Sequence, residues 1–251
     1  MKRCLYLLML PLFFIIPAAL GAVNLALWPV NQHINTGESS SLLWLKNTGG
    51  NNSNLSIRVL SWKQNQGNNY FEDQEEINIV PPVLGIMPGD KAFVRFFVSP
   101  ALHPTDERAY RIIVDEVPQL SSTNSDKVVL RMRYVLPLFI AGSLTPPAFQ
   151  QKGDALPERY PQVRWEMTRY KGAQVIALHN IGPVHARLSD ITLQNARDEK
   201  PLALHQGLFG YVLPGATLYL PIPPTVKSEA YQTLSARFFD GDSKTVAIPH
   251  E

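Results

Sequence analysis

Cysteine is almost absent from this chain: Cys4 is the only one among 251 residues. It precedes the predicted start of the mature chain, so the mature protein would have neither a disulfide bond nor a cysteine-based zinc site. An excess of one charge is also lacking. The formal net charge is +2, and without Lys2 and Arg3 the chain has 21 basic and 21 acidic residues. This balance argues against a nucleic-acid partner held by bulk charge.

The N-terminus has the pattern of a secretory signal. Lys2 and Arg3 form a charged start, residues 5–20 form an apolar core, and Ala19 and Gly21 fit the small-x-small cleavage pattern. We therefore predict a signal peptide over residues 1–21. No later run is long and apolar enough to span a bilayer.

Motifs for catalysis and for cofactors are missing. There is no G-x-S-x-G nucleophile elbow and no glycine-rich phosphate loop. The histidines include no pair at i, i+4 with a glutamate between them. We interpret His179 and His185, which flank the turn at residues 180–183, as loop-edge histidines without a ligand, and residues 72–76 as a solvated acidic loop. The sequence predicts no catalytic residue, no metal site and no cofactor, and therefore not an enzyme.

What is present is an all-β pattern. Short apolar or alternating runs recur with Asn, Gly and Pro turn signals between them. The predicted strands cover residues 24–28, 40–46, 55–64, 77–80, 93–99, 110–117 and 128–140, and then 162–170, 173–180, 187–194, 218–221 and 231–239. Seven strands in about 120 residues is typical of an immunoglobulin-like sandwich. We predict two such β-sandwich domains, at residues 22–143 and 144–251, with the boundary in a Pro-rich seam.

The most informative stretch is residues 127–140, KVVLRMRYVLPLFI. Read with period 2, it predicts a long strand with a continuous apolar face and a basic back. The apolar face carries Val128, Leu130, Met132, Tyr134 and Leu136. The other face carries Val129, Arg131, Arg133, Val135 and Pro137. A polar run precedes the strand and a Pro-rich run follows it, which favours a place at a sheet edge. Such an edge is a liability unless a partner pairs with it.

Several segments resemble the periplasmic pilus (fimbrial) assembly chaperones of the chaperone–usher pathway. Pro88-Gly89 followed by Val94-Arg95-Phe96 is similar to the family's "PG…VR" signature, and residues 106–118 resemble its "DRE…YR…EIP" block. Residues 178–183 are similar to the family's "L-x-N-x-(T/G)-P" turn. The order and spacing of these motifs cover essentially the whole mature chain.

The resemblance implies two immunoglobulin-like domains in a boomerang arrangement and a periplasmic location. It also implies that the protein binds pilus subunits by donor-strand complementation, which is a named case of β-strand addition, and delivers them to an outer-membrane usher. The donated side chains would be Val128, Leu130, Met132 and Tyr134. We expect the exposed apolar edge to be capped by self-association when no subunit is bound.

The chain departs from the family at the carboxylate anchor. Most members hold the subunit's terminal carboxylate with one basic residue on the first strand and one near the end of the last strand of the first domain. Residues 22–34 contain no Lys or Arg, and Pro137 occupies the usual lysine position. A buried carboxylate still needs a cation, and the candidates are Arg95, Arg131 and Arg133. Residues 58–64 (R-x-x-x-W-x-Q) and 133–139 (R-Y-x-L-P-x-F) resemble the archaic branch.

One alternative is a secreted two-domain adhesin or carbohydrate-binding module, which would need exposed aromatic side chains on a sheet face or loops. The tryptophans lie mostly in strand-like runs, which favours a place in the core. They are Trp28, Trp44, Trp62 and Trp165. A periplasmic hydrolase is the other alternative, and it lacks a nucleophile–base or metal constellation.

Overall fold

A computed structural model describes residues 25–117, 131–145, 161–195, 200–224, 226, 231–238 and 244–251. Within these ranges all regular structure is β-strand, arranged in four sheets, so the predicted all-β class is confirmed. No helix in the described part is long and apolar enough to cross a membrane. The predicted signal peptide and two predicted donor residues, Val128 and Leu130, lie outside the described residues.

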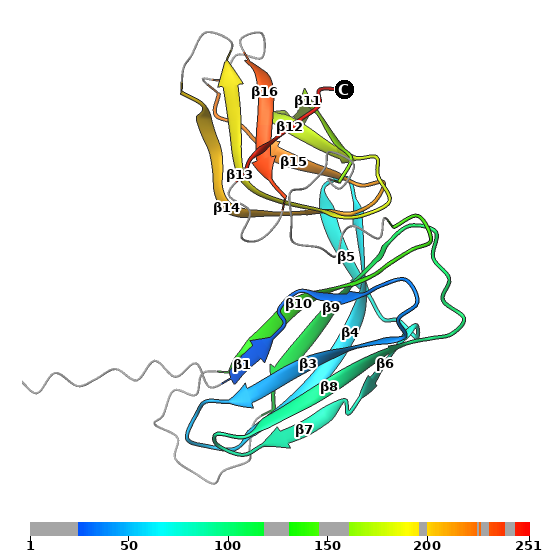
Figure 1. The fold of residues 1–251 in the computed structure, drawn as a ribbon. Coiled ribbons are helices and arrows are strands. Elements are labelled where there is room, and N and C mark those ends of the chain that lie inside the picture. The colour runs from blue at the N-terminus through cyan, green and yellow to red at the C-terminus, as the bar shows by residue number, and fades with distance from the viewer. Residues whose placement is uncertain are drawn as a thin grey trace, which may run out of the picture.

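The first domain is a sandwich of two sheets (Figure 1). One sheet has the strand order β1-β3-β8-β6, and the other has the order β2-β10-β9-β4-β5 with β7 also paired to β4. The strands are β1 (Leu25–Trp28), β2 (Gln32–Ile34), β3 (Ser40–Asn47), β4 (Ser53–Asn65), β5 (Asn68–Glu72), β6 (Ile77–Val80), β7 (Val83–Ile86), β8 (Lys91–Val98), β9 (Arg108–Glu116) and β10 (Arg133–Ile140).

Alternation with period 2 builds the core of this sandwich, because every second side chain of each strand faces the opposite sheet. In β3 the inward residues are Leu43 and Leu45, and in β8 they are Val94 and Phe96; all four are fully buried. Strand β9 contributes Tyr110, Ile112 and Val114 in the same way.

The second domain is also built from two sheets, with the orders β11-β12-β15 and β14-β13-β16-β17. Its strands are β11 (Val163–Tyr170), β12 (Ala173–Asn180), β13 (Ala186–Asn195), β14 (Leu202–Val212), β15 (Thr217–Pro221), β16 (Tyr231–Arg237) and β17 (Val246–Ile248). Trp165 is the largest fully buried side chain of its core. The predicted boundary after residue 143 falls between the two groups of strands and stays a prediction.

The tryptophans divide into two pairs. Trp62 and Trp165 are buried, at 3% and 1% exposure, as the sequence pattern predicted. Trp28 and Trp44 are 38% and 37% exposed on the outer face of the β1-β3-β8-β6 sheet, where their rings stack. The expectation that these two lie in the core was wrong, since Leu27 and Leu45, their neighbours in the chain, take the inward positions.

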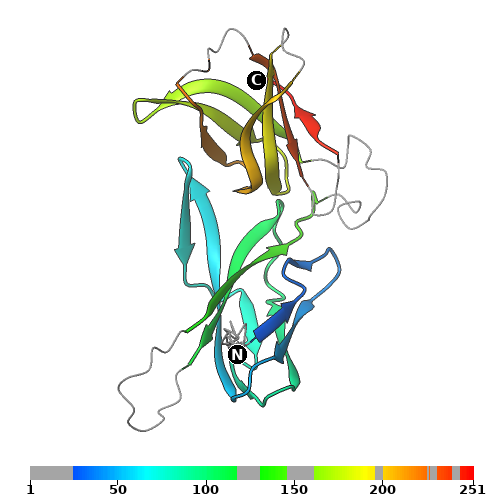
Figure 2. The ribbon, with the colours of Figure 1, turned by 90° about the vertical axis from the view of Figure 1, so that its left-hand side faces the viewer.

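The β4–β5 hairpin extends from the first domain to the second (Figures 1 and 2). Its two-residue turn, Gln66 and Gly67, has positive φ at both residues, as a tight hairpin turn requires. The backbone of Gly67 lies so close to the ring of Tyr219 that a Cβ would be 2.6 Å from it. The hydroxyl of Tyr170, whose ring stacks on Tyr219, donates to the carbonyl oxygen of Gln66 at 2.8 Å.

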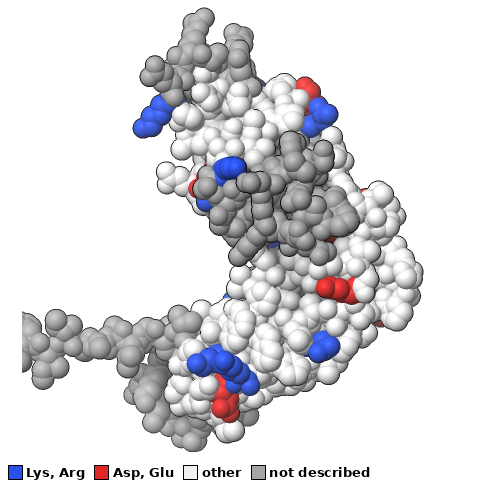
Figure 3. All heavy atoms as spheres, in the orientation of Figure 1, with Lys and Arg blue, Asp and Glu red and all other residues white. Residues whose placement is uncertain are grey.

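The two domains form a bent molecule that is hollowed between them (Figure 3). Where the domains meet, Trp62 and Phe139, on the outer face of the β2-β10-β9-β4-β5 sheet, contact Tyr211 of β14, and all three side chains are buried in this contact rather than in the hollow. We call this hollow the interdomain cleft.

Candidate functional site

Strand β10 is an open edge over most of its described length. It pairs with β9 along all eight residues, from Arg133 to Ile140. On its other side β2 covers only Leu138, Phe139 and Ile140, in parallel register. Residues 133–137 therefore have no strand beside them on that side within the described part of the chain.

The direction of the backbone groups shows what this edge offers. Glu116 N–H donates to the Met132 carbonyl on the β9 side, whereas Ala141 N–H donates to the Ile34 carbonyl of β2. Since successive residues of a strand present these groups to opposite edges, the odd-numbered residues of β10 face outward. The open edge thus presents the N–H and C=O groups of Arg133 and Val135.

Pro137 fits the middle of this strand for the same reason. A proline lacks the N–H group, and in a sheet it is tolerated where that group would not join the ladder. Its missing N–H belongs to the outer edge, so the pairing with Arg111 of β9 is retained.

The apolar stripe of the strand divides into a buried and an exposed part. Leu136 is 9% exposed and belongs to the core of the first domain. Tyr134 is half-buried against that core, its hydroxyl lies 3.4 Å from the Leu25 carbonyl oxygen, and burial raises its pKa. Met132 is 41% exposed. The stripe thus leaves the core at Tyr134, and from Met132 toward the N-terminus its described side chains face solvent.

The predicted anchor arginines are not brought together. Arg133 lies on the cleft side of β10, and its guanidinium makes two contacts with Asp115, at 2.5 and 3.2 Å. Arg58 also reaches Asp115, at 3.3 Å, and the hydrogen bonds from Arg133 hold the pKa of this carboxyl below its usual range. Arg131 is exposed just before the strand, and Arg95 lies on the other sheet with its guanidinium 5.6 Å from the Phe97 ring.

A fourth arginine, which the sequence analysis did not single out, lies in the interdomain cleft. The guanidinium carbon of Arg111 is 3.6 Å from the Trp62 ring centroid and 5.5 Å from that of Tyr211. Burial lowers its pKa. No described carboxylate lies within salt-bridge distance of it. Because Arg111 pairs with Pro137, it supplies a cation beside the position where the resemblance places a lysine.

Around Arg111 the two domains share an aromatic cluster. Phe139 stacks on His185 with 3.6 Å between ring centroids, and Tyr211 meets both Trp62 and Phe139. Gln64, in β4, donates to the Tyr211 carbonyl at 2.7 Å and accepts from Leu213 N–H at 2.9 Å. This cluster connects the end of β10 to the second domain.

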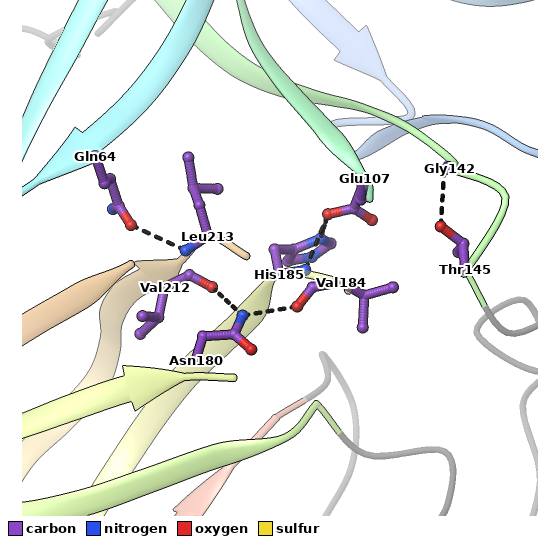
Figure 4. A network of polar contacts seen from close by, with 9 residues as sticks. All are labelled: Gln64, Glu107, Gly142, Thr145, Asn180, Val184, His185, Val212 and Leu213. Carbon is purple, nitrogen blue, oxygen red and sulfur yellow. Dashed lines mark hydrogen bonds and ion pairs between the residues drawn. The ribbon is translucent and has the colours of Figure 1, made fainter. Parts of the chain in front are cut away.

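His185 directly precedes β13, so it lies at a loop edge as interpreted, but it is only 5% exposed. Its Nδ1 lies 2.7 Å from a carboxylate oxygen of Glu107, which also accepts its backbone N–H at 2.9 Å (Figure 4). Glu107 is itself buried. A buried carboxylate needs such partners. In this pair, Glu107 of the first domain and His185 of the second domain meet at the interface.

The turn at residues 180–183 has its own polar centre. The side-chain amide of Asn180 donates to the carbonyl oxygens of Val184 and Val212, at 2.7 and 2.8 Å (Figure 4). Its side-chain oxygen accepts from Gly182 N–H. Asn180 is buried. It therefore fixes the loop that carries His185 to the interface.

This geometry defines a class: a two-domain β-sandwich protein with an open strand edge next to an interdomain cleft. Residues 26–144 match the family described as "Pili and flagellar-assembly chaperone, PapD N-terminal domain". Residues 26–144 are therefore similar to the N-terminal domain of this family, and the resemblance drawn from the sequence motifs is confirmed. No curated protein matches the sequence.

Solved structures of chaperones share the fold. A chain of the CsuC–CsuE chaperone–tip adhesion subunit pre-assembly complex, from the archaic chaperone-usher Csu pili of Acinetobacter baumannii, is 27% identical, with a TM-score of 0.71; the match covers 90% of this chain and 99% of that one. The Salmonella enterica SafA pilin–SafB chaperone complex gives 16% identity and a TM-score of 0.63, with 90% and 95% covered. The CupB2 chaperone of Pseudomonas aeruginosa gives 16% and 0.57, with 88% and 97% covered. The last two show the fold alone.

Proposed function

We propose that this protein is a periplasmic chaperone that binds pilus subunits by adding the edge of β10 to an incomplete subunit sheet. The observation that carries the proposal is the open edge at residues 133–137, which continues an apolar stripe that leaves the domain core. Main-chain groups on an edge give attachment that tolerates sequence variation, and alternate side chains fill pockets. The match to a chaperone in complex with a tip adhesion subunit supports subunits as the cargo.

The donor residues would be Val128, Leu130, Met132 and Tyr134. Burying one apolar side chain of this size contributes about 1.5–3 kcal/mol. Three or four of them give roughly 5–12 kcal/mol before the costs of ordering and association are subtracted. That is enough to hold a subunit without ATP, and the subunit's own folding would drive the reaction.

Arg111 is our preferred anchor for the subunit's terminal carboxylate. Its guanidinium is half-buried in the cleft and stacked on Trp62, and a carboxylate arriving there would meet a desolvated cation that can form two parallel hydrogen bonds. Arg133 is engaged by Asp115, and Arg95 lies on the other sheet, so both are placed less well. Arg131 is exposed next to the open edge and stays a candidate.

The proposal has three further parts. The protein passes to the periplasm after cleavage of residues 1–21, it delivers subunits to an outer-membrane usher, and it belongs to the archaic branch. The branch is supported by the higher identity to the archaic Csu structure, 27% against 16% for the CupB2 and SafA–SafB structures. The family is one of assembly chaperones, and we propose no catalytic step.

Strand addition can be tested at Val135, whose N–H faces the open edge. Val135→Pro removes that donor and leaves the β9 ladder intact, since Pro137 already occupies an equivalent position. The matched control, Val135→Ala, keeps the N–H. Each tagged variant is co-expressed with a subunit encoded beside the chaperone and recovered from periplasmic extract.

We expect Val135→Ala to recover the subunit and Val135→Pro to lose it, with both variants folded by circular dichroism. Equal recovery by the two variants would show that the edge is not the attachment site. A protein that recovers no subunit in any form but binds glycans would instead support an adhesin or carbohydrate-binding module.

A further inference from the structure

Three potential metal ligands meet in the second domain, away from the cleft. Glu166 lies on β11, His179 on the neighbouring strand β12, and Glu251 follows β17 at the end of the described chain. One ligand atom from each lies within 4.8 Å of the other two. The cluster thus combines one imidazole with two carboxylates, which is a donor set that zinc accepts.

The spacing of these atoms fits a metal better than direct hydrogen bonds. His179 Nε2 lies 3.5 Å from an oxygen of Glu166 and 3.5 Å from an oxygen of Glu251. Hydrogen bonds from nitrogen to oxygen are typically about 2.7–3.2 Å long. Two ligands about 2.0–2.1 Å from a tetrahedral zinc ion lie about 3.4 Å apart.

The orientation of His179 supports the same conclusion. Its Nδ1 lies 2.7 Å from the hydroxyl oxygen of Thr217 on β15. When that oxygen accepts a proton from Nδ1, Nε2 carries the lone pair that a metal requires, and such outer partners commonly fix a ligating histidine. Nε2 itself is shielded from solvent and has no hydrogen-bond partner. Its polar neighbours are the two carboxylates at 3.5 Å, and a cation between the three side chains would engage all of them.

We propose that Glu166, His179 and Glu251 form a site for zinc or a zinc-like transition-metal ion, with a fourth position open to water. The imidazole favours such ions over Mg²⁺ and Ca²⁺, which prefer oxygen ligands. The ion would fasten the segment that follows β17 to the β11-β12-β15 sheet.

The path of the chain gives this fastening a structural role. Strand β17 pairs with β16 in one sheet, whereas His250 forms a bridge to Trp165 of β11 in the other. Glu251 N–H then donates to the Trp165 carbonyl oxygen. Trp165 N–H donates to the Pro249 carbonyl oxygen in turn, so residues 249–251 join the two sheets of the domain. The predicted mature form has no cysteine that could supply a disulfide there.

The test is calorimetric titration of the mature full-length protein with Zn²⁺, after chelator treatment and at neutral pH, with Mg²⁺ as a second probe. We expect one Zn²⁺ per chain, a Tm that rises with zinc concentration, and no response to Mg²⁺. Co²⁺ in place of zinc should give the visible absorption of a low-coordinate nitrogen–oxygen site.

Variants separate this site from chance binding. His179→Gln should lose the one-to-one binding, and Thr217→Val should weaken it about 10–100-fold, as loss of an outer partner does. His205→Gln, on the other sheet, is the matched control and should bind like the unchanged protein. Absence of one-to-one binding, or equal affinity in the His179→Gln and His205→Gln variants, would overturn the proposal. Circular dichroism and Tm without metal show whether each variant is folded.

Discussion

The apolar stripe of β10 makes a prediction about two neighbouring positions on the same face. Leu136 is 9% exposed and Met132 is 41% exposed, although the sequence pattern treats them alike. Truncating a buried leucine to alanine costs about 2–5 kcal/mol of folding free energy. A surface substitution at Met132 should change it by about 0.5 kcal/mol or less.

Subunit binding should respond more strongly to the Met132 change. If the subunit covers the methionine, Met132→Ala forfeits about 1.5–3 kcal/mol of transfer free energy, which corresponds to roughly 10–150-fold weaker binding. In Leu136→Ala, the main loss should be in the free energy of folding of the chaperone rather than in subunit binding.

Urea unfolding of the free chaperone and titration with subunit measure the two quantities separately. With a slope of about 1–3 kcal/mol per molar urea, a loss of about 3 kcal/mol lowers the midpoint of Leu136→Ala by roughly 1–3 M. The midpoint of Met132→Ala should stay within a few tenths molar. If the two midpoints fall equally, or if Met132→Ala binds subunit as before, the stripe does not divide at Tyr134 and the donor-strand assignment fails.

Two further predictions concern the cleft. Arg111→Gln should strongly reduce the recovery of subunit, whereas Arg111→Lys keeps the charge and should retain part of the recovery. Loss of the contact with Trp62 should cost only about 1 kcal/mol of folding stability. Unchanged recovery in Arg111→Gln would exclude Arg111 as the anchor. His33 is exposed, but its ring stacks on Phe139 and His185. Desolvation there, with help from His185 and against the pull of Glu107, lowers the pKa of His33 from 6.5, and solvent keeps the effect on stability small. The neutral form is therefore favoured in the folded state, and the associated stability is present above pH 6.5 and lost as the pH falls below it. The Tm should fall on acidification, and it should fall less in His33→Gln. If the Tm of the two proteins falls equally with pH, His33 is not the group responsible.

The sequence predicted long strands well and short ones poorly. Predicted and observed ends agree within two residues for β3, β4 and β8, because each has a run of alternating side chains long enough to show period 2. Strands β2 and β17 have three residues each and carry no readable period. Strand β14 was missed because many of its residues are exposed and its pairing with β13 has register shifts, so its apolar residues do not alternate.

For the site, the sequence predicts a donor strand and its binding face, and both stay predictions; it does not show how far along that face the domain core extends. The extent of the core along β10 depends on β9 and on the strands at the start of the first domain, which pack beside it. The same reasoning explains Arg111. It was read as part of a family motif, and only the pairing of β9 with β4 and β10 places it over Trp62. A cation between the apolar residues Tyr110 and Ile112 was the available signal.

The histidines show a second limit. A sequence motif reveals only metal ligands at short spacing, whereas the proposed ligands Glu166, His179 and Glu251 come from three separate segments. Likewise, His185 and Glu107 are far apart in the chain and meet only because the domains do. Pair contacts of this kind depend on topology, which periodicity does not encode.

The two interdomain contacts have a consequence for binding. The β4–β5 hairpin holds Tyr170 and Tyr219 on one side of the cleft, and the Phe139–His185–Glu107 cluster holds the other. Arg111 lies between them and is stacked on residues of both domains. A cation and a strand edge that are fixed in place beforehand spare the complex part of the ordering cost that association otherwise carries. If Arg111 and the edge of β10 bind the subunit as we propose, the bend between the domains contributes to binding, because a change in that angle would separate Arg111 from Tyr211.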